Sequence, residues 1–283
     1  MSKIVADQAD GLRRMLARTP TRILAFTSML RGMGVTSVVM NLAAALAQQG
    51  RQVLLLDEHH PAPESIGRLW GVESAGSLAD VTAQRMTCEE AAAHAACGVR
   101  VLPALDCVDA IDPQLLQPHQ VVLIDARLDT AGNLSPLARV AGELVVVLRS
   151  DPTAITATYA GIKRLHYAHA LKQLRFVLNG IAHEEGAQRI AHNMAQVGSR
   201  YLGVSLESAG WVRTDARLAG ARRQRQSVVE AFPASPSAED MRRIADDMGH
   251  WPWRPATSQQ RPSTASAMKP PAGNQIQRRA ALA

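Results

Sequence analysis

The sequence contains few cysteines and lacks any long apolar run. Cys88, Cys97 and Cys107 are odd in number and stand in no paired CxxC or Cys/His spacing, which argues against a disulfide framework or a zinc site. No segment reaches the roughly 20 apolar residues that span a bilayer, and charges throughout the first twenty residues argue against a signal peptide. We therefore expect a cytoplasmic protein with ordinary thiols.

The charge is positive overall and unevenly placed. The formal net charge is +6 over 283 residues. Five arginines gather around a single acid, Asp215; they are Arg213, Arg217, Arg222, Arg223 and Arg225. A second basic group lies in a carboxy-terminal tail that has no acids. Such clusters are usually solvated surface, and the alternative is attraction of nucleic acid or anionic lipid.

Apolar runs alternate with helical stretches, which predicts an α/β fold with a mostly parallel sheet and helices on both faces. The expected strands are Arg22–Thr27, Gln52–Asp57, Val99–Leu102, Val121–Asp125, Leu144–Leu148 and Arg175–Leu178. The expected helices, of the length that parallel crossovers require, are Thr36–Gln49, Glu89–Ala95, Thr153–Ala170 and Gly186–Leu202. The strands are apolar throughout, as in sheets that are covered on both faces.

Composition divides the chain into three parts. Residues 1–19 carry apolar residues at helical spacing and precede Pro20, which predicts an appended amphipathic helix. Residues 20–250 hold the α/β pattern. Residues 251–283 are rich in Pro, Ser, Thr, Gln and Ala with scattered basic residues, which predicts a disordered basic tail.

A loop that suits phosphate binding follows the first expected strand. The segment from 26 to 37 reads FTSMLRGMGVTS and leads into the helix that begins near Thr36. Backbone N–H groups in such a loop, together with the positive end of the following helix, can bind a phosphate. Gly32 and Gly34 suit that geometry.

The loop keeps only half of the fixed positions of a Walker A motif. The pattern G-x-x-x-x-G-K-[ST] requires glycine at position 29 and lysine at position 35. The chain has Met29 and Val35 there, so only Gly34 and Thr36 match.

The region that follows the loop resembles the MinD/ParA family of P-loop ATPases. The resemblance is carried by NLAAALA at 41–47 and QVLLLD at 52–57. It implies ATP and Mg²⁺ as ligands and a second, signature lysine at the position of Leu30. Because both lysine positions are apolar, we expect ATP hydrolysis to be impaired or lost, and whether the chain is an enzyme stays open. Arg31 is the alternative source of positive charge, although a guanidinium is not equivalent to a lysine.

Two aspartates match acidic positions of the family. Asp57 matches the first acid of a D-x-D motif whose second acid is replaced by His59, and Asp129 stands where the family has a switch glycine. Asp125 matches the aspartate that ends the Walker B strand. The resemblance makes Asp57 and Asp125 the catalytic candidates, and Thr36 with Asp125 the metal candidates. The structural alternative for Asp125 is that it caps the next turn.

The residues that the resemblance matches to the base pocket are retained, in contrast to the two lysines of the loop. Asn179 matches the family's adenine-contacting asparagine, although Asn-Gly is also a turn signal, and Asp215 lies where the family approaches the base. The nucleotide-binding set that the resemblance predicts is Arg31, Gly32, Gly34, Thr36, Ser37, Asn179 and Asp215.

The amino-terminal segment points to one branch of that family. DQADGLR at 7–13 resembles the D-Q-A-x-x-L-R signature of the FlhG flagellar-number regulators, which are also called FleN or YlxH. In that branch the helix docks on the GTPase FlhF and stimulates its hydrolysis. The predicted partner-binding residues are therefore Asp7, Gln8, Leu12 and Arg13. An amphipathic helix suits a partner groove, and the alternative is a helix packed on its own domain.

The sequence thus predicts a regulator of flagellar number and placement that docks on FlhF and has little or no ATPase activity. The resemblance also implies flagellar switch-complex proteins, a flagellar transcription regulator and a second copy of the chain as partners. A position at the inner face of the membrane has weak support, because residues 275–282 are short and weakly amphipathic. One alternative is a weak ATPase that uses Arg31 and cycles between a monomer and an ATP-bound dimer.

The other alternative is a ParA-like partition factor, or a cellulose-synthesis accessory factor, that binds phosphate backbones through the five-arginine cluster. The amino-terminal signature argues against that reading and against DNA as the partner.

Overall fold

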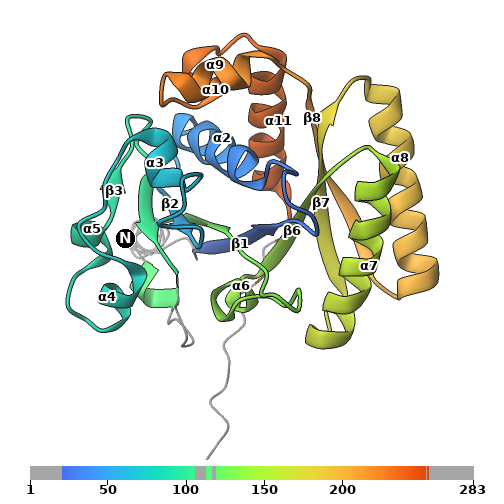
Figure 1. Ribbon diagram of the computed structural model, residues 1–283, viewed down its shortest axis with the longest axis horizontal. Coiled ribbons are helices and arrows are strands. Elements are labelled where there is room, and N and C mark those ends of the chain that lie inside the picture. The colour runs from blue at the N-terminus through green and yellow to red at the C-terminus, as the bar shows by residue number, and fades with distance from the viewer. Residues whose placement is uncertain (1–20, 106–112, 117–118, 253, 255–283) are drawn as a thin grey trace, which may run out of the picture.

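A computed structural model of the protein describes residues 21–105, 113–116, 119–252 and 254. Its eight-stranded sheet has the order β3-β4-β2-β5-β1-β6-β7-β8 (Figure 1). All neighbouring strands are parallel except β3 and β4, which confirms the predicted α/β fold with a mostly parallel sheet. The strands are β1 (Arg22–Thr27), β2 (Val53–Asp57), β3 (Ala93–His94), β4 (Arg100–Pro103), β5 (Val121–Asp125), β6 (Glu143–Arg149), β7 (Gln173–Ile181) and β8 (Ser205–Arg213).

Helices cover both faces of the sheet. One face packs against α2 (Val35–Gln48), α3 (Ile66–Trp70), α9 (Arg217–Arg223), α10 (Val228–Ala231) and α11 (Pro236–His250). The other face packs against α4 (Leu78–Thr82), α5 (Cys88–Ala91), α6 (Pro136–Val140), α7 (Pro152–His169) and α8 (Glu184–Val197). A 3₁₀ turn at Pro113–Leu116 and a π-helical turn at Gly198–Leu202 complete the described elements.

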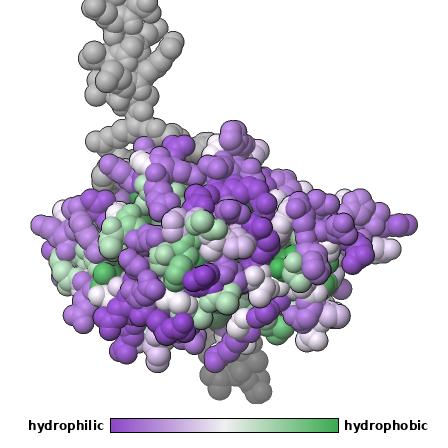
Figure 2. All heavy atoms as spheres, turned by 90° about the horizontal axis from the view of Figure 1, so that it is seen from above, coloured by the Kyte–Doolittle hydropathy of each residue, from purple (hydrophilic) through white to green (hydrophobic). Residues whose placement is uncertain are grey.

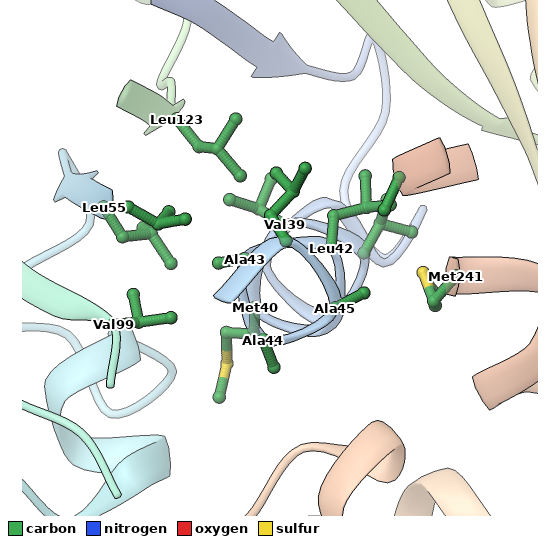
Figure 3. Packing of buried hydrophobic residues seen from close by; sticks show 14 of the residues in the cluster. Val39, Met40, Leu42, Ala43, Ala44, Ala45, Leu55, Val99, Leu123 and Met241 are labelled. Carbon is green, nitrogen blue, oxygen red and sulfur yellow. The ribbon is translucent and has the colours of Figure 1, made fainter. Parts of the chain in front are cut away.

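Alternate residues of the central strands supply the two cores. In β1, Ile23 and Ala25 belong to one buried cluster, while Leu24 and Phe26 belong to the other. Period-two alternation explains why these strands are apolar on every residue. Figure 3 shows α2 between the strands that carry Leu55 and Leu123 and helix α11. This packing fixes the start of α2 above the carboxyl end of β1.

The predicted helix over residues 89–95 is wrong in its second half. Helix α5 ends at Ala91, and β3 pairs antiparallel with β4. The cause is a tight turn at Gly98, whose φ of 83° suits glycine. Gly98 N–H donates to the Ala95 carbonyl at 2.9 Å, which folds the chain back onto β4.

The predicted helix over residues 186–202 is also corrected. Helix α8 begins at Glu184 and ends at Val197, and a π-helical turn follows and ends at Gly203, whose φ is 64°. Strand β8 comes next and was not predicted. Its sequence SLESAGWVR mixes polar residues and a glycine with apolar ones, so it lacks the continuous apolar run of a central strand. This composition fits an edge strand, and β8 has one neighbour, β7.

The start of the predicted tail contacts the domain. Arg22 Nη2 donates to the Trp251 carbonyl at 2.5 Å, and the Arg175 guanidinium lies 4.3 Å over the Trp251 ring. Arg254 Nη1 lies 3.1 Å from Glu143 Oε1. The predicted amino-terminal helix and residues 255–283 lie outside the described residues, so their predicted states stay predictions. Within the described ranges, no helix combines the length and the apolar character that a membrane span requires.

Candidate functional site

The loop after β1 presents backbone N–H groups toward the carboxyl edge of the sheet. Gly34 is the N-cap of α2 with a φ of 85°, and no side chain caps the helix. The first intrahelical bond runs from Val38 N–H to the Gly34 carbonyl at 3.0 Å. The amino end of α2 also lacks acidic residues in its first turn. Since the first N–H groups of a helix have no intrahelical acceptor, this end can accept an anion.

The two lysine positions and the missing glycine are occupied by apolar side chains. Met29 packs against α7, where a methyl group at Gly161 would lie 2.1 Å from the Met29 sulfur. Val35 is partly buried against the core around α2. Leu30 remains 37 % exposed. Apolar packing thus anchors the loop at Met29 and Val35, while the apolar Leu30 is left partly exposed.

Arg31 is exposed in the same loop. Its guanidinium makes no ion pair or hydrogen bond with another residue that the structure describes. Arg31 and Gly32 lie on the loop after β1, and Gly34, Thr36 and Ser37 lie at the start of α2.

Asn179 reaches this loop from the end of β7. Its Nδ2 donates to the Met33 carbonyl at 2.9 Å. A methyl group at Gly34 would lie 2.4 Å from the same nitrogen, so the close approach of Asn179 requires glycine at 34 as well as the positive φ. The predicted base-contacting asparagine and the loop are brought together, and the amide is engaged with the loop backbone.

Asp215 lies elsewhere and caps helices. Its Oδ1 accepts from Arg217 N–H at 2.8 Å, and its Oδ2 accepts from the Ser237 hydroxyl at 2.7 Å. Partial burial raises the pKa of this carboxyl, but these hydrogen bonds outweigh it and leave the pKa below its ordinary value. The carboxylate joins the amino ends of α9 and α11.

Asp57 is buried and accepts two backbone hydrogen bonds. Its Oδ1 accepts from His59 N–H at 2.8 Å and its Oδ2 accepts from Ile66 N–H at 2.7 Å, at the start of α3. The side chain is 1 % exposed. These contacts assign Asp57 a structural role in ordering the turn after β2.

Asp125 ends β5 beside Asp57 and is fully buried. Neither carboxylate oxygen has a hydrogen-bond donor among the described residues. Burial raises the pKa of Asp125 to about 7, and the charges of Asp57 and Glu58 reinforce the shift. The Thr36 hydroxyl is near enough to oppose the shift, although its geometry is not that of a hydrogen bond. The capping alternative for Asp125 is therefore not supported by a hydrogen bond from a described residue.

His59 stands next to Asp125. His59 Nε2 lies 3.7 Å from Asp125 Oδ1, and burial lowers the pKa of the imidazole. His59, at the position predicted for the family's second acid, thus faces Asp125, the predicted Walker B aspartate. Among the described residues, no group of three or more His, Cys, Asp and Glu side chains is arranged to hold a metal ion.

Sequence reasoning missed Glu58, which completes this buried acidic cluster. Its Oε2 accepts from Arg127 N–H at 2.8 Å and its Oε1 accepts from the Ser135 hydroxyl at 2.6 Å. Burial raises its pKa. The signal was present, because Asp57, Glu58 and His59 are three consecutive titratable residues at the end of an apolar strand.

Other predicted features are engaged in local structure. Asp129, at the switch-glycine position, accepts from the N–H of Asn133 at 2.8 Å. In the five-arginine cluster, Arg213 pairs with Asp240 at 2.9 Å and Arg217 lies 5.1 Å over the Phe232 ring. Cys88 and Cys97 are free, and burial raises the pKa of each thiol to about 11.

The site fits ATP and Mg²⁺ only in part. The open amino end of α2 and the two positive-φ glycines suit a phosphate. The apolar residues at positions 29, 30 and 35 supply no charge to it, and Asp57 is engaged with backbone N–H groups. The predicted partner-binding residues, Asp7, Gln8, Leu12 and Arg13, lie outside the described residues.

Comparison with known proteins gives one curated relative of high coverage. The chain is 31 % identical over 258 residues to the antiactivator FleN of Pseudomonas aeruginosa. The matched region spans 85 % of this chain and 91 % of that protein. No protein-family model matches the chain.

Solved structures of MinD share the fold. MinD of Aquifex aeolicus has a TM-score of 0.63 and 17 % identity, and covers 82 % of this chain and 98 % of its own. MinD of Pyrococcus horikoshii, solved with Mg-ADP, has a TM-score of 0.60 and 22 % identity, and covers 81 % of this chain and 96 % of its own. At these identities the similarity establishes the fold alone.

Proposed function

We propose a function from one premise: the chain belongs to the FleN family, also called FlhG, of MinD/ParA-type proteins. Membership supports a regulator of flagellar number and placement. The protein acts by binding partners, and ATP hydrolysis is impaired or lost. The observation that carries the second part is the loop after β1, where Leu30 and Val35 occupy both lysine positions.

Apolar packing on the domain holds the loop after β1 in place. Met29 fills the space beside Gly161, and Val35 packs against the core around α2. Phosphoryl transfer requires cations placed at the developing charge, and an apolar side chain cannot supply that charge. A single exposed guanidinium, Arg31, is left on the loop.

The acidic half of the site supports the same conclusion. Asp57 is engaged by two backbone N–H groups, and the residue at the family's second acid position, His59, brings an imidazole to Asp125 where the family has a carboxylate. If ATP binds, backbone N–H groups near Gly32, Gly34, Thr36 and Ser37 hold its phosphates. Thr36 and Asp125 would be the Mg²⁺ residues, and Asn179 lies within reach of the loop.

Titration of the purified full chain with a fluorescent ATP analogue and Mg²⁺ tests the site. The matched positive control is a Leu30→Lys/Val35→Lys variant, which restores both lysines. Silence in the wild type with binding in the variant supports a regulator that does not use nucleotide. Micromolar binding by the wild type would show that the backbone and Arg31 suffice, and turnover above a blank would contradict the loss of hydrolysis.

The partner that the amino-terminal signature indicates is the GTPase FlhF. We propose that residues 1–19 dock on it through Leu12 and that Asp7, Gln8 and Arg13 make the polar contacts, as an amphipathic helix does in a groove. Deleting residues 1–19 should abolish stimulation of FlhF hydrolysis, while Asp125→Ala should leave it within about twofold. Equal loss in both variants would contradict this division of roles.

Further partners of the same proposal are flagellar switch-complex proteins, a flagellar transcription regulator and a second copy of the chain. A solved complex pairs MinD with MinC in Aquifex aeolicus. The proposed location is the cytoplasm, with peripheral contact at the inner membrane face. Pull-down with the full chain and with a chain truncated after residue 254 separates tail-dependent contacts from domain contacts.

Two other functions have specific observations behind them. Arg31 is exposed and makes no ion pair with a described residue, which favours a weak ATPase; turnover that vanishes in Arg31→Ala would support it. The exposed Arg222 and Arg223 favour a DNA contact, but Arg213 and Arg217 are already engaged. DNA binding that falls steeply with salt would support that alternative.

A further inference from the structure

A cavity of about 1020 Å³ lies over the carboxyl ends of β2 and β4. Its walls come from α3, the segment that follows α3, and the turn between α9 and α10. Of the residues assigned above to the nucleotide site, its lining includes only Asp57. Ligands of parallel α/β sheets bind at the carboxyl ends of the strands, and pockets of this size accommodate small molecules.

Arg225 is held in an unusual backbone conformation at this cavity. Its φ is 55°, which is uncommon for a residue with a side chain, and its N–H bonds to the Arg222 carbonyl at 3.1 Å. Arg225 directly follows the end of α9, and Gln226 N–H bonds back to the Ala221 carbonyl at 3.1 Å, so the termination of the helix sets this backbone. The helix end thereby fixes the point from which the Arg225 side chain starts.

Gly71 makes room for that side chain. It ends α3 with a φ of 68°, and a methyl group there would lie 2.7 Å from both Cδ and Nη1 of Arg225. The guanidinium thus lies across bare glycine backbone. Two positive-φ residues from distant parts of the chain together determine where the charge sits.

The cations of the cavity have unused hydrogen-bond capacity. The guanidinium groups of Arg225 and Arg68 make no ion pair or hydrogen bond with any residue in the part of the chain that the structure describes. Two lining acids, in contrast, already accept bonds: Asp80 from Ser77 and Arg85, and Asp57 from two backbone N–H groups. Glu73 is exposed, and the face of the molecule that Figure 2 shows is largely hydrophilic with scattered hydrophobic patches.

We propose that the cavity between α3, β4 and the α9–α10 turn binds a small phosphate- or carboxylate-bearing molecule through Arg225 and Arg68. A guanidinium fork matches the geometry of both oxyanions and binds them bidentately. Gly71 and the left-handed backbone of Arg225 preorganise that fork. The site is separate from the loop after β1 and does not depend on the function proposed above.

Calorimetric titration of the full chain with sodium pyrophosphate and with sodium citrate, at ionic strength matched with chloride, tests the proposal. Saturable binding of pyrophosphate identifies a phosphate ligand, and saturable binding of citrate identifies a carboxylate ligand. The key variant is Arg225→Gly, because glycine adopts the same φ without strain and the fold is kept. It should weaken binding at least tenfold.

Two further variants complete the experiment. Arg222→Ala removes the same charge from an exposed helix position outside the cavity and should leave binding within about twofold. Gly71→Ala keeps both arginines but displaces the guanidinium, and should weaken binding as Arg225→Gly does. The thermal midpoint of each variant verifies that it is folded.

Three outcomes would overturn the proposal. They are no saturable binding of either probe, equal binding by wild type and Arg225→Gly, and loss of pyrophosphate binding in Arg31→Ala with retention in Arg225→Gly. The last result would place the anion on the loop after β1.

Discussion

His59 Nε2 lies 3.7 Å from Asp125 Oδ1 at the carboxyl edge of the sheet. Burial acts on both groups in the direction that favours their neutral forms: it raises the pKa of Asp125 to about 7 and lowers that of His59.

Asp125→Asn should stabilise the protein at neutral pH. The carboxyl titrates near pH 7 when folded and near its ordinary 3.8 when unfolded, so the folded chain holds a proton that the unfolded chain has released between these values. The stability from this group is complete below about pH 4 and is lost as the pH rises toward 7. Asparagine stays neutral, so the variant should gain up to a few kcal/mol above pH 7, at about 1.4 kcal/mol per pKa unit.

Urea unfolding of wild type and variant from pH 4 to 8 measures this gain, which should shrink toward acid. His59 has the opposite sign, because its lowered pKa costs stability as the pH falls below 6.5. Repeating the comparison in a His59→Gln background removes that contribution. A difference that does not change with pH would contradict the prediction.

Asp57→Asn should destabilise the fold by about 1–3 kcal/mol, because the amide has one acceptor oxygen and one of the N–H groups of His59 and Ile66 loses its partner. The free energy of unfolding in urea at pH 7.5 measures the loss. Asp129→Asn is the matched control, since Asp129 also accepts two hydrogen bonds from one turn but is exposed. Equal losses would argue against a buried structural role for Asp57.

The effect of Gly161→Ala on the free energy of unfolding should change sign when the residue at position 29 is changed. In the wild type the new methyl group meets Met29 Cγ at 2.4 Å and Sδ at 2.1 Å, so overpacking should cost about 1–3 kcal/mol. In a Met29→Ala background the space is free, and the better helix propensity of alanine should stabilise α7 by up to about 1 kcal/mol. The four proteins form a double-mutant cycle read by urea unfolding, and additive effects would show that the two residues do not touch.

Glu143→Gln should lower the free energy of unfolding by more than Glu207→Gln does. The Glu143 side chain is 5 % exposed and bridges Arg175 and Arg254, whereas Glu207 is 38 % exposed and pairs with the same Arg175. Losing the buried partner should cost roughly 3 kcal/mol or more, and losing the exposed one less than about 1 kcal/mol. Similar shifts in the urea midpoint of the two variants would contradict the buried bridge.

The sequence by itself determined the sheet. Continuous apolar runs such as Val121–Asp125 predict strands covered on both faces, and the helical stretches between them predict parallel crossovers, so the central strands were placed within a few residues. The two edge strands were not, since an edge strand is polar or short and its pairing depends on turns such as that at Gly98. The absence of both lysines was also fixed by the sequence, because it is a property of positions 30 and 35 alone.

The tertiary structure decided what the remaining residues do. Hydrogen-bond partners and burial come from parts of the chain that are distant in sequence, so no local pattern distinguishes a catalytic aspartate from a capping one. Asp57 became a structural acceptor and Asp125 a buried acid without a donor among the described residues. The same reason applies to Gly71 and Arg225, whose contact spans two distant turns and exists only because the sheet brings them together.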